Sequence, residues 1–164
     1  MESKYFPIEI EEKWSKVWSD RTLDKPNSEH HFSQIIPPPN VTGTLHMGHS
    51  FQYAIMDFYT RYHHMSGTDA FWQVGTDHAG IATQMVVENN LANQGKSKDD
   101  LGRDGFLKEV WKWKDFSEEK ITSQMKRLGI TVDWDKYRFT FDDQFCTAVN
   151  LSLIHISEPT RQQG

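Results

Sequence analysis

Two histidines three residues apart, His46 and His49, end a segment rich in proline, glycine and hydroxyl residues, PPPNVTGTLHMGH at 37–49. If a helix begins here, this spacing projects both rings from one face of its first turn. The amides and the positive dipole end at a helix start favour an anion, and imidazoles donate hydrogen bonds to phosphate oxygens. Gly48, between them, leaves room for a flat ring to approach the helix backbone. The segment therefore predicts a nucleoside triphosphate site.

The elements on either side of this segment are a strand and a helix. A β-like run at 32–36 stops at three consecutive prolines, 37–39, because proline cannot donate to a sheet ladder. A helix is predicted from near His46 to Gly67. Its apolar residues step by four and three, which predicts one buried face. These residues are Phe51, Ile55, Phe58, Tyr62 and Met65.

A second strand and a second polar loop follow. The run 71–74 is β-like and closes at Gly75, the polar segment 76–78 comes next, and a helix is predicted to about Gln94, stopped by Gly95. A strand–helix–strand crossover makes the two strands parallel, and ligands of such α/β sheets bind at the carboxyl edge. We therefore expect an α/β fold in which residues 40–49 and 75–80 meet in space.

The flanking segments are mostly helical. Residues 9–20 read as an amphipathic helix, 22–31 as a connector, 101–129 as helix-rich and 134–141 as β-like or irregular. We expect three parts: an N-terminal helix and connector at 1–31, a nucleotide-binding domain at 32–150, and a tail at 151–164. The string LSLIHISEPTR at 151–161 resembles the translation of a sequencing-library adapter. We therefore expect the native sequence to stop near Asn150 and the tail to carry no function.

The composition is that of a globular protein. The 164 residues carry 18 Lys+Arg and 23 Asp+Glu, a net charge of −5, with 37% hydrophobic and 13% aromatic residues, too apolar for a disordered acidic chain. No run approaches the ~18 apolar residues of a membrane span, so no membrane association is expected. The single cysteine, Cys146, excludes an internal disulfide framework and suits the reducing cytoplasm.

Two blocks together carry a family resemblance. His46-Met-Gly-His49 is similar to the HIGH signature of class I aminoacyl-tRNA synthetases. The longer string PPPNVTGTLHMGH, followed by GTDHAGIATQ at 75–84, resembles the valine-specific members of that family, and the likeness extends over roughly residues 1–150. It implies the first half of a Rossmann-like nucleotide-binding domain with parallel strands and an N-terminal helical extension. A four-letter motif alone occurs often by chance, whereas thirteen residues plus a second block are highly specific.

The resemblance implies a reaction and a set of roles. The reaction is formation of valyl-AMP from valine and ATP, normally with Mg²⁺, followed by transfer to valine tRNA. His46 and His49 would be catalytic and bind the ATP phosphates, with Gly48 facing adenine and Thr44 adding a hydroxyl near the phosphates. In the amino-acid pocket, Pro38 and Asn40 would line the wall, and Asp77 would bind the substrate ammonium group.

The sequence departs from the family pattern and leaves alternatives open. The Lys-rich KMSKS loop does not occur in this chain, and Lys96-Ser97-Lys98 is only a superficial echo. We therefore expect the 164-residue chain by itself not to charge tRNA. The alternatives are an isoleucyl- or leucyl-type synthetase, an HxGH nucleotidyltransferase of another kind, or a non-catalytic module that holds ATP or tRNA.

Several of these residues also have plainer interpretations. The two motif histidines with His78 could form a metal site, although no metal is expected because the proline and glycine string has no role in one. Asp77 could instead cap the helix that follows it. We expect His63 and His64 to lie on the solvated outer side of the helix that begins near residue 46.

Overall fold

The computed structural model describes residues 6–19 and 29–157 of the chain. Most of the expected connector, and residues 158–164 of the expected tail, lie outside these ranges. The elements occur in the following order: α1 (Pro7–Ser19), β1 (His31–Ile35), α2 (Met47–Met65), β2 (Asp69–Gln73), β3 (Gly75–Thr76), α3 (Ile81–Asn93), α4 (Lys98–Leu128), the 3-10 turn η1 (Trp134–Lys136), β4 (Arg138–Phe139), α5 (Asp143–Ser152) and the π-helical turn η2 (Leu153–Ser157).

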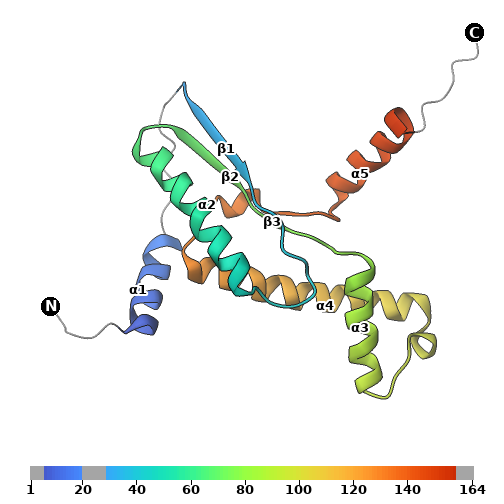
Figure 1. The fold of residues 1–164 in the computed structure, drawn as a ribbon. Helices are drawn as coiled ribbons and strands as arrows, with labels where there is room; N and C mark the ends of the chain where they lie inside the picture. Colours follow the sequence, from blue (N-terminus) through green and yellow to red (C-terminus); the bar gives the residue numbers. More distant parts are fainter. Residues whose placement is uncertain (1–5, 20–28, 158–164) are drawn as a thin grey trace, which may run out of the picture.

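The first sheet is the crossover unit that the sequence predicts. Strands β1 and β2 are parallel and in register from His31 opposite Asp69 to Ile35 opposite Gln73, with α2 running between them in the chain (Figure 1). Helix α2 packs on the sheet through Gln34 of β1, whose amide nitrogen donates to the Met56 carbonyl oxygen at 2.7 Å. The predicted parallel arrangement is confirmed.

The second pairing was not predicted. Strands β3 and β4 are also parallel, with Gly75 opposite Arg138 and Thr76 opposite Phe139. A Cβ atom at Gly75 would collide with the Arg138 carbonyl oxygen. Gly75 therefore does not simply end a strand, as expected from the sequence. It allows a distant segment to approach the backbone closely.

The predicted buried face of α2 is wrong. Its members are exposed, from 44% for Ile55 to 83% for Met65. The face turned inward instead carries Tyr53 and Thr60, which are fully buried. The predicted stripe does share one side of the helix, but no described segment covers that side, because periodicity says which residues lie together and not what packs on them.

Histidines near the end of α2 also differ from expectation. The ring of His63 stacks on Phe32 of β1, with centroids 3.9 Å apart. The Nε2 atom of His64 is buried and has no hydrogen-bond partner among the described residues. The prediction that both lie on a solvated outer side is therefore wrong, because the last turns of α2 lie against the sheet.

The core lies between the first sheet, α2 and α4. Helix α4 crosses beneath the sheet and α2 (Figure 1), and Ile121 and Met125 of this helix are at most 1% exposed. The buried cluster consists of Ile36, Tyr53, Trp72, Val74, Ile121, Met125, Ile130 and Val132. Burial raises the pKa of Tyr53 to about 12. This packing fixes the start of α2 relative to the strand ends.

Helix α4 begins and ends where local chemistry dictates. Ser97 caps its first turn, since the Asp100 amide donates to the Ser97 hydroxyl and the Asp100 carboxylate accepts from the Ser97 amide. Gly129 ends it in the left-handed conformation, with φ of 71°. The segment Lys96-Ser97-Lys98, which resembles part of the KMSKS loop, is therefore the cap of a helix. Helix α5 projects away from the rest of the fold (Figure 1).

Candidate active site at the sheet edge

The start of α2 is a capping box made of two imidazoles. The Gly48 amide donates to Nδ1 of His46 at 3.1 Å, and the His46 amide donates to Nδ1 of His49 at 3.3 Å. The two rings stack with centroids 3.8 Å apart. Glutamate or glutamine ordinarily supplies the second half of such a box, so here the helix start is built by the residues that also carry the predicted chemistry.

These contacts decide where the ring protons are. A backbone N–H can only donate, so each Nδ1 must be an unprotonated acceptor, and each neutral ring carries its proton on Nε2. Burial, with the neighbouring His46 as a second cause, lowers the pKa of His49. Each ring therefore has an Nε2–H donor that the capping box does not use.

Gly48 is required by the cap itself. A Cβ atom there would lie 2.9 Å from Cε1 and 3.0 Å from Nδ1 of His46. A side chain at this position would therefore push the His46 ring out of its capping geometry. This constraint exists before any ligand binds, in addition to the predicted approach of adenine.

The loop before α2 is held by α4. Trp113 Nε1 donates to the Val41 carbonyl oxygen at 3.0 Å, and the Gln124 amide oxygen accepts from the Leu45 amide at 2.9 Å. Between them, Ser117 Oγ donates to the Gly43 carbonyl oxygen at 2.8 Å. Spacings of four and seven place the three α4 side chains on one helix face. This clamp was not predicted, although the spacing of the three residues is visible in the sequence.

The two polar loops meet where the first sheet ends. Asn40 and Asp77 form a parallel bridge, in which the Asp77 amide donates to the Pro39 carbonyl oxygen and the Val41 amide donates to the Asp77 carbonyl oxygen, both at 2.9 Å. The expected meeting of segments 40–49 and 75–80 is confirmed at this bridge. Pro38 and Thr44 lie in the segment between β1 and α2, and both are exposed.

Asp77 does not cap α3. The residue at the N-cap is Gly80, which makes no side-chain capping bond. Between them, Ala79 has a φ of 52°, which makes it the one non-glycine residue in the left-handed region within the described ranges. Such a conformation costs roughly 1–2 kcal/mol, and strain of this kind collects at functional sites. The capping alternative is therefore wrong, and the Asp77 carboxylate has another use.

The carboxylate contacts a residue that the sequence analysis missed. Thr140, which follows β4, donates from its hydroxyl to Oδ1 of Asp77 at 2.8 Å. The same hydroxyl lies 2.7 Å from Nδ1 of His78. Residues 134–141 were predicted only as β-like or irregular. Thr140 directly follows the short β-like run that forms β4, and a polar residue after a parallel strand is the signal that could have placed it at this edge.

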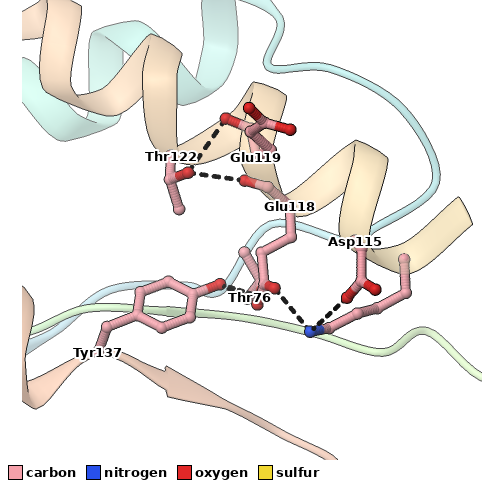
Figure 2. A network of polar contacts seen from close by, with 7 residues as sticks. Thr76, Asp115, Glu118, Glu119, Thr122 and Tyr137 are labelled. Atoms are coloured by element: carbon pink, nitrogen blue, oxygen red, sulfur yellow. Dashed lines mark hydrogen bonds and ion pairs between the residues drawn. The ribbon is translucent and has the colours of Figure 1, made fainter. Parts of the chain in front are cut away.

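A network of polar contacts joins Thr76 of β3 to Glu118 of α4 through Tyr137 (Figure 2). The Tyr137 hydroxyl lies 2.5 Å from Thr76 Oγ1 and donates to Glu118 at 2.7 Å. Lys114 pairs with the other Glu118 oxygen at 2.6 Å. Burial raises the pKa of Tyr137. Burial by itself would lower the pKa of Lys114, but the contacts of Lys114 with Glu118 and Asp115 raise this pKa above its ordinary value. The network holds the residue directly before Asp77.

The described part of the chain contains neither a cluster of metal ligands nor a membrane-spanning helix. No three histidine, cysteine, aspartate or glutamate side chains there gather closely enough to hold a metal ion. His78 instead contacts Thr140 and packs against Phe141, with ring centroids 5.2 Å apart. None of the helices in the described ranges has the length and apolar character needed to cross a membrane.

Comparison with known proteins places the chain in a family. Residues 9–160 match the family of class I tRNA synthetases that comprises the I, L, M and V types, and the chain belongs to it. It is 52% identical over 155 residues to the valine--tRNA ligase of Acinetobacter baylyi (strain ATCC 33305 / BD413 / ADP1), a match that covers 94% of this chain. The chain spans 16% of that relative's length. The predicted resemblance to class I synthetases is confirmed.

A solved structure supports the fold. The chain is similar to the agnB2 LeuRS of Agrobacterium radiobacter K84 in its ternary complex with tRNA and LeuAMS, with a TM-score of 0.68 and 20% sequence identity. The match covers 92% of this chain and 18% of that one. At this identity the likeness concerns the fold alone, and it confirms the expected partial α/β domain.

Proposed function

We propose that this chain forms the ATP and valine sites of a valine--tRNA ligase. The observation that carries the proposal is the pair of Nε2–H donors that the capping box leaves unused on His46 and His49, at the first turn of α2. The clamped loop joins this turn to the Asn40–Asp77 bridge. The 52% identity to a valine--tRNA ligase favours valine over the isoleucyl and leucyl alternatives. Membership of the synthetase family leaves no support for a different HxGH nucleotidyltransferase.

The histidines act on the phosphates. A carboxylate oxygen of valine attacks the α-phosphorus of ATP, the new O–P bond forms, and the bond to the pyrophosphate oxygen breaks. Negative charge on the α-phosphate oxygens increases as this happens, and Nε2–H donors fixed in advance stabilise it without reorganisation. Gly48 gives adenine access to the helix backbone, and Thr44 adds a hydroxyl near the phosphates. Catalysis thus consists of alignment and electrostatic stabilisation.

The amino acid binds at the strand ends. The Asp77 carboxylate pairs with the ammonium group of valine, a charge-assisted contact, while Pro38 and Asn40 line the pocket. Because Asp77 and Asn40 share a backbone bridge, the ammonium group and the rest of valine are held by one rigid unit. Rigid placement of one reactant is what converts a bimolecular reaction into an aligned one.

Besides valine and ATP, the complete reaction uses a metal ion and a third substrate, tRNA. ATP enters as its Mg²⁺ complex, with the ion held by the phosphates and counted as part of the substrate. Valyl-AMP then passes its aminoacyl group to the 3′ end of valine tRNA, which binds mostly to other parts of the complete enzyme. We place this reaction in the cytoplasm, where tRNA is charged.

A chimera tests the proposal. Residues 9–150 of this chain replace the matching segment of the Acinetobacter baylyi enzyme, and amino-acid-dependent exchange of pyrophosphate into ATP is measured with valine, isoleucine and leucine. We expect exchange with valine. Exchange that prefers isoleucine or leucine would overturn the valine assignment, and a chimera that folds but exchanges with none would overturn the site. The isolated 164-residue chain is the companion sample, expected to charge no tRNA.

A further inference from the structure

The hydroxyl of Thr140 is the meeting point of three polar contacts. It donates to Oδ1 of Asp77 at 2.8 Å, the His78 amide donates to it at 2.9 Å, and Nδ1 of His78 lies 2.7 Å away. Asp77 and His78 are neighbours in the chain, whereas Thr140 arrives from more than 60 residues downstream. One side chain thus contacts both Asp77, which the proposed function uses, and its neighbour His78.

Counting protons fixes the direction of each contact. A hydroxyl has one proton and two lone pairs. Its proton points to the Asp77 carboxylate, because an ionised carboxylate can only accept. Both lone pairs are then left for donors, which are the His78 amide and His78 Nδ1–H. The hydroxyl is therefore saturated, and neutral His78 carries its proton on Nδ1, the opposite tautomer from the two motif histidines.

This arrangement leaves defined atoms for a ligand. Oδ1 of Asp77 also lies 3.3 Å from His78 Nδ1, but the one proton of that nitrogen is directed to Thr140, so the Thr140 hydroxyl is the group that holds Oδ1. No contact from a described residue engages Oδ2. The Asp77 side chain is 34% exposed and that of His78 is 43% exposed, so both remain accessible.

We propose that Thr140 is a positioning residue for valine: its hydroxyl locks the Asp77 carboxylate with Oδ2 toward the substrate ammonium group and holds His78 in the Nδ1–H tautomer. The inference rests on the proposed role of Asp77. Thr140 touches no reacting atom, and it acts by keeping the carboxylate in one rotamer before valine arrives. Preorganisation of this kind lowers the cost of binding.

The hydroxyl is separable from the pairing of the strands. The Thr140 amide donates to the Thr76 carbonyl oxygen at 3.1 Å and continues the β3–β4 ladder. A valine at position 140 retains this amide and has nearly the same shape, but lacks the hydroxyl. Thr140→Val therefore removes the positioning contacts and leaves the backbone pairing, while Thr140→Ser retains the hydroxyl.

The first experiment uses the chimeric synthetase. For Thr140→Val we expect KM for valine to rise by about tenfold or more, the effect of losing a hydrogen bond to a charged group. KM for ATP should change less than twofold, and Thr140→Ser should restore KM for valine to within about threefold. An unchanged KM for valine, or equal rises for valine and ATP, would overturn the inference.

Asp77→Asn in the same chimera separates the two proposals. If Asp77→Asn raises KM for valine and Thr140→Val does not, the positioning inference fails and the proposed function stands. If neither substitution changes KM for valine, the assignment of Asp77 fails with it.

The second experiment reads the tautomer without activity. Nitrogen-15 NMR of the 164-residue chain, with His78 assigned through His78→Gln, should show the Nδ1–H form of the neutral ring. Thr140→Val should shift it toward the Nε2–H form, and Thr140→Ser should not. An Nε2–H tautomer in the unmodified chain would overturn the inference. If the isolated chain does not give a folded spectrum, the same measurement on the labelled chimera decides.

Discussion

The two halves of the candidate site are built in different ways. At the start of α2, His46 and His49 are held by amides within three residues of themselves. At the Asp77–His78 loop, the holding group is Thr140, and β4, the strand directly before it, pairs with β3 across more than 60 residues. A local capping motif therefore presents the phosphate donors, while long-range packing presents the amino-acid site. The first should tolerate changes in the fold better than the second.

The largest expected effect falls on the local half. His49→Ala in the chimera should lower valine-dependent exchange by about 10²–10³-fold, because one fixed donor to the developing phosphate charge is lost. Circular dichroism should report an unchanged helix content, since the alanine removes only one of the two cap contacts.

His46→Asn separates the capping role of this histidine from its role as a donor to phosphate. Asparagine caps helices well but lacks the Nε2–H donor that the cap leaves unused, so activity should fall while α2 persists. Full activity in His46→Asn would contradict the phosphate role.

A substitution in the half of the site that depends on long-range packing should lower the stability of the fold. Gly75→Ala places a methyl group against the Arg138 carbonyl oxygen, and overpacking of this kind costs about 1–3 kcal/mol. Urea unfolding of the 164-residue chain, followed by circular dichroism, measures the loss. The matched control is Gly43→Ala, because a Cβ there meets no atom within 4 Å. Equal stability of the two variants would show that the β3–β4 pairing is looser than described.

A smaller effect should distinguish two roles of Gly48, one in the helix cap and one in the approach of adenine. Gly48→Ala should displace the His46 ring even without ATP, because the new Cβ would lie 2.9 Å from its Cε1. We expect the His46 ring signals to shift in NMR spectra of the free chain, and valine-dependent exchange in the chimera to fall about tenfold, the equivalent of ~1.4 kcal/mol. If the His46 signals stay in place, the glycine serves only the approach of adenine.

The smallest effect is a pH dependence of the local cap. The pKa of His49 lies below its ordinary value of 6.5, so the unfolded chain binds more protons than the folded one around this pH. Stability from this residue is therefore present above pH 6.5 and is lost as pH falls through the folded pKa. Protonation of Nδ1 also removes the acceptor for the His46 amide. His49→Gln supplies an acceptor that does not titrate, so comparing urea midpoints between pH 5 and 8 should give a flatter profile for that variant.

The exposed side of α2 limits what periodicity alone can predict. The residues from Phe51 to Met65 do recur at helical spacing, and they do lie on one side of the helix. Tyr53 and Thr60 are buried instead, because the sheet and α4 pack on that other side. Spacing within a helix is a local property, whereas the choice of buried face depends on which elements are present to cover it.

The sequence by itself determined the elements whose causes are local. Prolines end the first strand, Ser97 and Gly129 bound α4, and the motif histidines cap α2. The parallel crossover also followed from element order, since handed connections leave few alternatives. Only the tertiary structure decided that Gly75 admits β4, that α4 clamps the 41–45 loop and that Thr140 saturates its hydroxyl on Asp77 and His78. Those contacts join residues far apart in the chain, and no local pattern specifies which distant side chain completes a hydrogen bond.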